Sequence, residues 1–472
     1  MDVVDTGTTA FMLCCIIGLT LMIPGLALFY GGMVSVKSST NMMMMTFGAV
    51  AIVGVLWVLF GFSMVFGTSY DGFVGSFTEF LGMKDLLESQ TTISGLPISL
   101  FSLFQALFAA ITVALISGAV ADRMKFGAWM LFATAWAVLV YVPVAHWVFA
   151  FDGVVTENSI GGWIANSLKA IDFAGGTAVH INAGAAALAV AIVLGKSAMF
   201  GQLRKPHNVP LTLLGAGLLW AGWYAFNGGS ALAAGNSAAI VMVTTFVATC
   251  AATLAWLAVE KFKDGHVTGV GAASGAITGL VAITPACGAV TPVGAIAVGA
   301  IAGAICVYAV GLKSKFGYDD SLDVVGVHLV GGVIGTLLIG FFASESMPNA
   351  TNGLFYGGGV DQLWRQAVAA FAVMAYSFVV AFAIAFALKK TMGIRISPEE
   401  EEKGIDSAFH RTWWIGTWPR LAVPPAWLEP FLSGGGITRS MTVYFQPVST
   451  HQSRRRIERD LVKLESDAIT KE

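Results

Sequence analysis

Eleven long apolar segments fill most of the first 390 residues, and they limit the possible folds more than any other feature. Most are as long as the roughly 20 residues that an α-helix needs to cross a bilayer. A segment in lipid must satisfy its own backbone hydrogen bonds, so these segments are predicted to be helices. They span residues 8–31, 41–67, 99–119, 127–150, 175–195, 209–228, 237–259, 269–284, 291–310, 324–344 and 361–388.

The distribution of charge separates a membrane domain from a polar C-terminal part. Only 11% of the residues are charged, against about 25% in an average soluble domain. Of the 26 Lys and Arg and the 28 Asp and Glu residues, 22 lie in residues 391–472. We therefore predict an all-α polytopic membrane domain over residues 1–390, followed by a polar tail. The net charge of −2 gives no indication of a nucleic-acid partner, and none is expected.

The loops between the segments predict the orientation of the chain. Cytoplasmic loops of membrane proteins carry an excess of Lys and Arg. One set of alternate loops holds thirteen of these residues, whereas the other holds only Lys84, Lys169 and Arg365. We therefore predict that the N-terminus lies outside and that the C-terminal tail lies in the cytoplasm.

Two histidines lie within the apolar segments. His180 follows Asp172 in the fifth segment, and His328 follows Asp323 in the tenth. Ionisable groups inside a membrane span are costly and usually functional. If helices one to five and six to ten form two inverted five-helix repeats, the histidines meet near the pseudo-twofold axis. The alternative is that each is a buried histidine whose ring is satisfied by a backbone carbonyl.

The two aspartates lie where helices are predicted to begin. Asp172 precedes Gly175 and Gly176, where a carboxylate can accept hydrogen bonds from exposed N–H groups. Capping of the helix and binding of a cation are both compatible with this position. For Asp323, at the start of the tenth segment, capping is the favoured role.

Aromatic residues gather at two places. Phe104 and Phe108 lie four residues apart on one face of the third segment. Trp223 and Phe226 precede Ser230 at the end of the sixth segment. Such residues usually belong to an interfacial belt or a core, but a group of ring faces can also hold a small cation. The sequence predicts no metal site, no cofactor and no enzyme chemistry, because it has no zinc-type cysteine spacing, phosphate loop or nucleophile constellation.

Seven stretches of the sequence match a known pattern in order over residues 8–406. They are PGLALFYGGMV (24–34), ALISGAVADRMKF (114–126), DFAGGTAVHINA (172–183), GWYAFNGGSA (222–231), TPACGAV (284–290), DVVGVHLVGGVIG (323–335) and GIRISPEEEEKGID (393–406). Together they resemble the ammonium transporter family (Amt/Mep/Rh), and their variants are similar to the Amt branch.

The resemblance implies a homotrimer with one conduction path through each subunit. The site residues that it implies are His180 and His328, which face the pore, Phe108 and Phe226, which form a stacked gate, and Ser230 at an outer ammonium site, with Trp223 and Phe104 nearby. It also implies that Asp172 is an essential outer aspartate, which agrees with a structural role for its carboxylate.

One stretch departs from the family pattern. Family members often carry a Trp beside the outer site in a sequence such as AHWVWGGG, whereas this chain reads AHWVFAFDGVV. Phe149 takes the place of that Trp, and a longer loop precedes Trp163. Phe149 could supply the ring, Trp163 could swing in, or the outer site could be weaker.

The C-terminal part divides at residue 406. Residues 391–406 resemble the family's cytoplasmic tail, which is implicated in coupling between subunits and in regulation by PII-type signal proteins. Residues 407–472 are predicted to be an atypical cytoplasmic extension. Within it, residues 439–447 alternate as a strand does, and residues 452–470 have the pattern of a charged amphipathic helix.

The function implied by the resemblance is ammonium transport by a multi-pass protein of the bacterial cytoplasmic membrane. Ammonium would be recruited at the outer site, deprotonated near the gate because desolvation lowers the pKa of a cationic acid, and passed as ammonia along the histidine-lined pore. The histidines could relay the proton, and the sequence leaves open whether transport carries net charge. An ammonium sensor and a channel for a neutral molecule such as carbon dioxide or water are the alternative functions.

Overall fold

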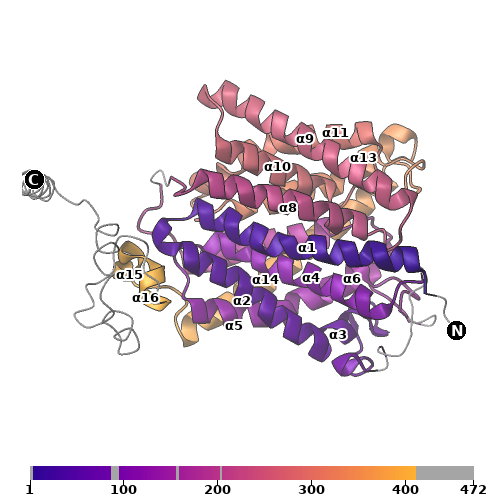
Figure 1. Ribbon diagram of the computed structural model, residues 1–472, viewed down its shortest axis with the longest axis horizontal. Coiled ribbons are helices and arrows are strands. Elements are labelled where there is room, and N and C mark those ends of the chain that lie inside the picture. The colour runs from indigo at the N-terminus through magenta and orange to yellow at the C-terminus, as the bar shows by residue number, and fades with distance from the viewer. Residues whose placement is uncertain (1–3, 85, 87–94, 156–158, 202–204, 411–472) are drawn as a thin grey trace, which may run out of the picture. The chain divides into compact units, whose positions relative to one another are not determined.

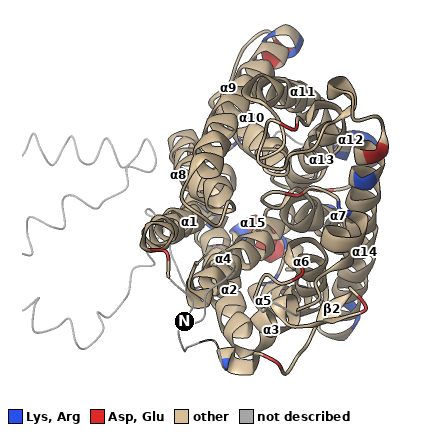
Figure 2. Ribbon diagram, turned by 90° about the vertical axis from the view of Figure 1, so that its right-hand side faces the viewer, with Lys and Arg blue, Asp and Glu red and all other residues tan. Residues whose placement is uncertain are grey.

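The computed structural model describes residues 4–84, 86, 95–155, 159–201 and 205–410. These residues form a bundle of long helices whose axes run roughly side by side (Figure 1). Seen along the bundle, most of the ribbon belongs to uncharged residues (Figure 2). The strand and the amphipathic helix predicted beyond residue 410 lie outside the described residues.

Among the described residues, ten helical stretches are long and apolar enough to cross a membrane. Their helices are α1 (Thr6–Met33), α2 and α3 (Ser39–Leu56 and Phe62–Phe66), α4 (Ile98–Ile116), α5 and α6 (Phe126–Trp136 and Val142–Phe149), α7 (Asn182–Leu194), α8 (Val209–Gly229), α9 (Asn236–Asp264), α11 (Pro292–Ala309), α13 (Val330–Phe342) and α14 (Asp361–Thr391). The predicted segment 269–284 forms α10 (Gly269–Ile283), which has only 15 residues.

Short elements connect and extend these helices. Apart from the π-helical turns, they are α12 (Leu312–Phe316), α15 (Pro398–Lys403), α16 (Ile405–Phe409), the 3₁₀ turns η1 (Val36–Ser38), η3 (Leu81–Met83), η4 (Ser117–Val120) and η9 (Leu354–Tyr356), and a two-stranded antiparallel hairpin of β1 (Ser69–Tyr70) and β2 (Val74–Gly75).

Among the described residues there are five π-helical turns, and such turns often occur at functional sites. They are η2 (Trp57–Gly61), η5 (Ala137–Tyr141), η6 (Ile164–Leu168), η7 (Gly176–Ile181) and η8 (Val325–Leu329). The last two lead directly into α7 and α13, and each carries one of the two histidines. Both histidines therefore lie where the helix is wider than a regular α-helix, and both side chains are buried.

Glycine allows the helices to approach closely, as is common in membrane bundles. Helix α1 packs along α8. A Cβ atom added to Gly215 of α8 would lie 2.3 Å from the backbone nitrogen of Phe29 on α1. A larger residue at position 215 would therefore separate the two helices that carry part of the site.

The start of the C-terminal tail is bound to a loop and to the first turn of α2 at one end of the bundle. Residues 394–396 form backbone hydrogen bonds with residues 123–125. The Asp406 carboxylate accepts hydrogen bonds from the backbone N–H groups of Thr40 and Asn41, at 3.0 and 2.7 Å. Figure 1 shows α15 and α16 at the end of the bundle opposite to the start of α1.

Candidate functional site

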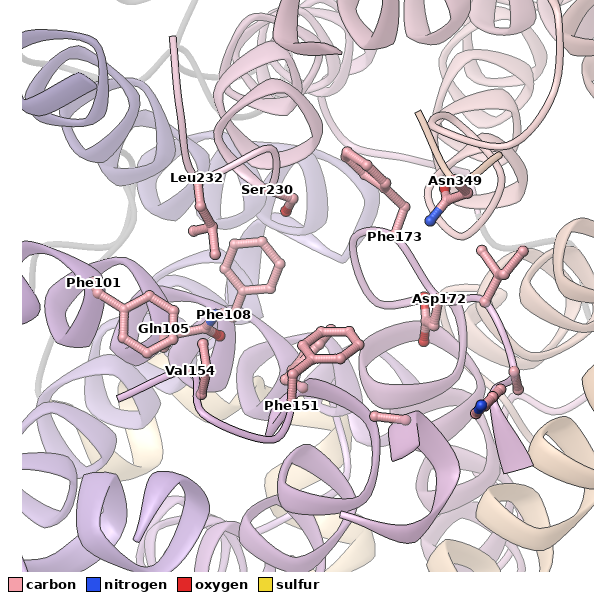
Figure 3. A pocket seen from close by; sticks show the side chains of 15 residues that line it. Phe101, Gln105, Phe108, Phe151, Val154, Asp172, Phe173, Ser230, Leu232 and Asn349 are labelled. Carbon is pink, nitrogen blue, oxygen red and sulfur yellow. The ribbon is translucent and has the colours of Figure 1, made fainter. Parts of the chain in front are cut away.

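A cavity of about 320 Å³, here called the vestibule, opens at the end of the bundle where α8 ends and α4 begins. Figure 3 shows Ser230 and the ring of Phe108 on one side of it and Asp172 on another. Its lining is mostly apolar, with few polar groups. The lining residues are Phe101, Gln105, Phe108, Phe149, Phe151, Val154, Ala165, Lys169, Ala170, Ile171, Asp172, Phe173, Ser230, Leu232 and Asn349.

Two stacked phenylalanine rings close the inner side of the vestibule. The ring centroids of Phe108 and Phe226 are 3.9 Å apart, and the rings are inclined by 17°. Both side chains are buried. Phe104 supports this pair from behind, with its ring centroid 4.9 Å from that of Phe108. Phe104 is not among the described residues that line the vestibule, so its ring buttresses the pair instead of facing the cavity.

A second, narrow cavity of about 10 Å³ begins at Phe226. A volume of this size holds about one water molecule. Apart from two histidines, a tryptophan and a tyrosine, its wall is aliphatic or phenylalanine. The lining residues are Met22, Leu26, Phe29, Tyr30, Ile111, Leu115, His180, Leu219, Trp223, Phe226, Ile277 and His328.

The two histidines meet in this narrow cavity. Nδ1 of His180 lies 3.2 Å from Nδ1 of His328, and the two rings are inclined by 28°. One of the two nitrogens must donate its proton to the other, so each ring is in a different tautomer. One Nε2 then carries a proton, and the other is a free acceptor. Among the described residues, Nε2 of His180 has no hydrogen-bond partner, which leaves it available to a small molecule in the cavity.

Trp223, expected beside Ser230, instead lines the narrow cavity on the other side of the phenylalanine pair. Its ring stacks on His180 with 5.5 Å between centroids, and its Nε1 donates to Oγ1 of Thr284 at 2.9 Å. Trp223 lies seven positions before Ser230, the residue that follows α8, which corresponds to about 10 Å along a helix. Trp223 therefore orients a histidine and lies too deep to contact the vestibule.

Ser230 is the residue that caps α8 at the vestibule. Its hydroxyl donates to the carbonyl of Phe226 at 2.9 Å. Because the donor proton is used in this bond, the lone pairs of Oγ remain available to accept hydrogen bonds from a molecule in the vestibule. Gln105, which was not predicted, also lines the vestibule. It lies three residues before Phe108 on α4, and this helical spacing is the signal that could have identified it.

Asp172 binds the start of the helix that carries His180. Its Oδ1 accepts from Gly175 N and Gly176 N at 2.8 and 2.6 Å. Its Oδ2 accepts from Thr177 N at 2.8 Å and Ala178 N at 3.2 Å, and from the Thr177 hydroxyl. Burial raises the pKa of Asp172, and these hydrogen bonds oppose that shift. Both carboxylate oxygens are thus occupied by protein donors.

Asp320 caps the π-helical turn η8, which carries His328. The prediction that Asp323 is the cap is therefore wrong. Oδ2 of Asp320 accepts from Val325 N at 2.7 Å. Oδ1 of Asp323 instead lies 2.6 Å from Nζ of Lys313, and the Asp323 backbone is left-handed, with a φ of 62°. Burial raises the pKa of Asp320 to about 6, although Lys313 lowers it.

A common spacing could have identified Asp320. Asp172 lies eight residues before His180, and Asp320 lies eight residues before His328. Each aspartate accepts backbone hydrogen bonds at the start of the π-helical turn that carries its histidine. The two histidine turns are therefore built in the same way.

Of Phe149 and Trp163, the two candidates for the aromatic ring beside the outer site, only one lines the vestibule in the described structure. Phe149 lines the vestibule, and its ring meets that of Phe108 edge to face at 6.1 Å. Trp163 packs against Trp147 at 5.9 Å and is not among the described residues that line the vestibule. Of the two candidates, Phe149 is the ring that faces the cavity.

Comparisons with known proteins agree on one family. A family model described as the Ammonium Transporter Family matches residues 10–413. A curated ammonium transporter of Mycobacterium tuberculosis is 53% identical over 432 residues, which cover 87% of this chain and 90% of that protein. The ammonium transporter of Corynebacterium glutamicum is 41% identical over 408 residues, which cover 86% of this chain and 89% of that protein.

Solved structures share the fold. The crystal structure of Saccharomyces cerevisiae Mep2 has a TM-score of 0.76 and 32% identity, over 84% of this chain and 88% of that chain. A structure described as Sensor Amt Protein has a TM-score of 0.78 and 29% identity, over 85% of this chain and 98% of that chain. The chain therefore belongs to the Ammonium Transporter Family and is a multi-pass ammonium transporter of the cell membrane, a class of protein that moves its substrate and does not transform it.

Proposed function

We propose that ammonium is recruited in the vestibule and crosses the protein as ammonia along the narrow cavity. The observation that carries this proposal is the order of the parts: a partly polar vestibule, a stacked phenylalanine pair, and then a nearly apolar cavity with two bonded histidines. In the vestibule, Oγ of Ser230 accepts a hydrogen bond from the cation, and the ring of Phe149 attracts its charge. Ammonium there stays partly hydrated.

The ion loses its proton where the path becomes apolar. An unpaired cation in the narrow cavity would cost several kcal/mol or more, whereas ammonia carries no charge to desolvate. The stacked rings of Phe108 and Phe226 exclude water at this point and favour the neutral form. Potassium has no proton to lose, so the same barrier rejects it.

The histidine pair accepts both ammonia and the proton. The bare Nε2 of one ring takes the proton that ammonium releases, and the Nδ1–H of that ring passes its own proton to the second ring. The second ring then releases its Nε2 proton towards the inner end. Ammonia follows and is protonated again in the cytoplasm, so each nitrogen carries one positive charge across. The tautomers must be restored before the next ion is deprotonated.

We further propose eleven membrane crossings in two inverted repeats, with the N-terminus outside. An odd number of crossings is supported by the location of α15 and α16 at the end of the bundle opposite to the start of α1 (Figure 1). The short helix α10 then supplies the eleventh crossing. The repeat is supported by the matched histidine turns, each preceded by an aspartate cap. The vestibule then faces the outside.

The assembly that we propose is a homotrimer in the lipid bilayer, with one path in each subunit. Its cytoplasmic tail is a candidate contact for a PII-type signal protein. The hydrogen bonds of the tail with residues 40, 41 and 123–125 support this assignment, because they couple the tail to the start of α2 and to the loop that precedes α5.

Replacing Ser230 with alanine tests the recruitment site. We expect Ser230→Ala to raise the half-saturation concentration for ammonium about fivefold, because one hydrogen bond to the ion, worth about 1 kcal/mol, is lost. The measurement is ammonium-dependent current in liposomes that contain the full-length protein. Ser346→Ala, on a loop residue that is not among the described vestibule residues, is the matched control. An unchanged half-saturation concentration in Ser230→Ala would exclude Ser230 from the site.

Enlarging the ring at position 149 tests the aromatic contribution. We expect Phe149→Trp to lower the half-saturation concentration about twofold, because Trp gives a stronger cation–π attraction than Phe and the whole contact is worth about 0.5–1 kcal/mol at a solvated site. Trp163→Phe should leave it unchanged, because Trp163 packs against Trp147. If instead Trp163→Phe weakens ammonium binding and Phe149→Trp has no effect, Trp163 supplies the ring.

A sensor is the second candidate function, favoured by the similarity to the structure described as Sensor Amt Protein. The two functions differ in flux. A transporter produces a sustained current or uptake of methylammonium in liposomes, whereas a pure sensor binds the ion and passes none. Sustained flux in the wild-type protein would therefore decide for transport.

A further inference from the structure

The vestibule of this cation transporter contains a lysine. Lys169 lines the same cavity as Ser230, Phe108 and Asp172. It is exposed at the rim of the cavity. A positive charge at this place is unexpected in a cavity that recruits a cation, because like charges repel and the field inside a cleft changes the local concentration of ions.

The backbone holds Lys169 in a defined position. It ends the turn η6 in the left-handed conformation, with a φ of 57° and its N–H bonded to the carbonyl of Ile164. The preceding carbonyl, of Leu168, accepts from Nη1 of Arg365 at 2.9 Å. Two residues further on, both backbone groups of Ile171 are bonded to the Gln366 side chain at 2.7 Å. The rim segment is therefore fixed to α14 on both sides of the lysine.

The charge of Lys169 is not neutralised by a partner among the described residues. No ion pair between described residues includes this lysine. The nearest carboxylate in sequence, Asp172, uses both oxygens to accept five hydrogen bonds from residues 175–178. Among the described residues that line the vestibule, Lys169 and Asp172 are the only ionisable ones. The field in the cavity therefore depends on an unpaired ammonium group and a carboxylate whose charge is spread over protein donors.

We infer that Lys169 determines the affinity of the vestibule by repelling cations, and so sets the ammonium concentration at which transport is half-saturated. This inference rests on the proposed recruitment of ammonium in the vestibule. The lysine repels every monovalent cation, but only ammonium can leave the vestibule by losing a proton. Lys169 therefore lowers the occupancy of the vestibule by potassium, and it weakens the site for ammonium to the same extent.

The test is a charge series at position 169 in the full-length protein in liposomes. Lys169→Asn removes the charge and Lys169→Asp reverses it, and both residues tolerate the left-handed conformation. Two charges about 10 Å apart in water change occupancy about twofold. We therefore expect the half-saturation concentration to fall about twofold for Asn and about fourfold for Asp at low ionic strength. The maximal current should not change, and Lys169→Arg should behave as the wild type.

Salt supplies an independent readout, because the Debye length is about 8 Å at 0.15 M ionic strength. The difference between Lys169→Asn and the wild type should shrink to less than about 1.5-fold there. Lys84→Asn, on the same predicted outer side but not among the described vestibule residues, is the control and should have no effect. Equal half-saturation concentrations across the charge series, or an equal shift in Lys169→Arg and Lys169→Asn, would overturn the inference.

Measuring Ser230→Ala in the same liposomes separates the role of Lys169 from the recruitment of ammonium in the vestibule. If Ser230→Ala weakens ammonium binding and the charge series has no effect, ammonium enters through the vestibule and only the role of Lys169 fails. If neither Ser230→Ala nor the charge series changes the half-saturation concentration, the vestibule is not the recruitment site and both proposals fail.

Discussion

Replacing both histidines with alanine is expected to lower the ammonium-dependent current roughly a hundredfold, the usual scale of a lost proton-transfer group. His180 and His328 are bonded through their Nδ1 atoms at 3.2 Å inside a cavity of about 10 Å³. Without the rings, the proton has no carrier through the apolar part of the path. Each single alanine variant should lose nearly as much as the double variant, because the two rings act as one unit.

A conservative variant separates the relay from the binding of ammonia. His328→Gln can still hydrogen-bond to His180, but an amide cannot pass a proton on. We expect it to lose the current while ammonia still crosses, which is seen as alkalinisation inside the liposomes after an ammonium pulse. Cys306→Ala, a fully buried residue of α11 that is not among the described residues lining either cavity, controls for loss of packing. Unchanged current and unchanged selectivity over potassium in the double alanine variant would rule out the relay.

The helical membrane fold could be predicted because length and hydropathy alone define a spanning helix. The prediction failed in detail where the helix departs from regular geometry. In the loop before the turn η8, Asp323 has a φ of 62° and pairs with Lys313, whereas Asp320 accepts the hydrogen bond that caps the turn. Which of two aspartates three residues apart caps the turn depends on the conformation of this loop, and no periodicity in the sequence indicates that conformation.

The sequence identified residues that line the two cavities, but it could not predict how deep in the bundle each residue lies. Ser230 and Trp223 belong to one short stretch, yet the six residues between them place Trp223 in the narrow cavity, against His180. The choice between Phe149 and Trp163 depended on the course of the loop between them, which brings Trp163 against Trp147. Such tertiary contacts follow from packing between distant segments, so a local pattern cannot reveal them. The number of crossings, the repeats and the roles of the site residues stay predictions.

Replacing Asp172 with alanine is expected to destabilise the turn that carries His180 and to abolish transport. The carboxylate accepts hydrogen bonds from four backbone N–H groups and one hydroxyl at the start of the turn that carries His180. A donor left without a partner in a buried place costs about 1–3 kcal/mol, so the total cost is several kcal/mol, even after some donors find new partners. We expect a thermal unfolding midpoint in detergent about 5 °C lower for Asp172→Ala.

The asparagine variant decides between a structural and a direct role for this carboxylate. Asp172→Asn keeps one acceptor oxygen, but its NH₂ group faces backbone donors, so its unfolding midpoint should lie between those of the wild type and Asp172→Ala. Asp152→Asn is the matched control, because the described contacts of the Asp152 side chain comprise one acceptor bond, from Gly161 N at 2.7 Å. If the losses of current follow the losses of stability, Asp172 acts by holding the histidine turn in place. If Asp172→Asn is as stable as the wild type and yet carries no current, its negative charge acts on the ion itself, and the capping role is not sufficient.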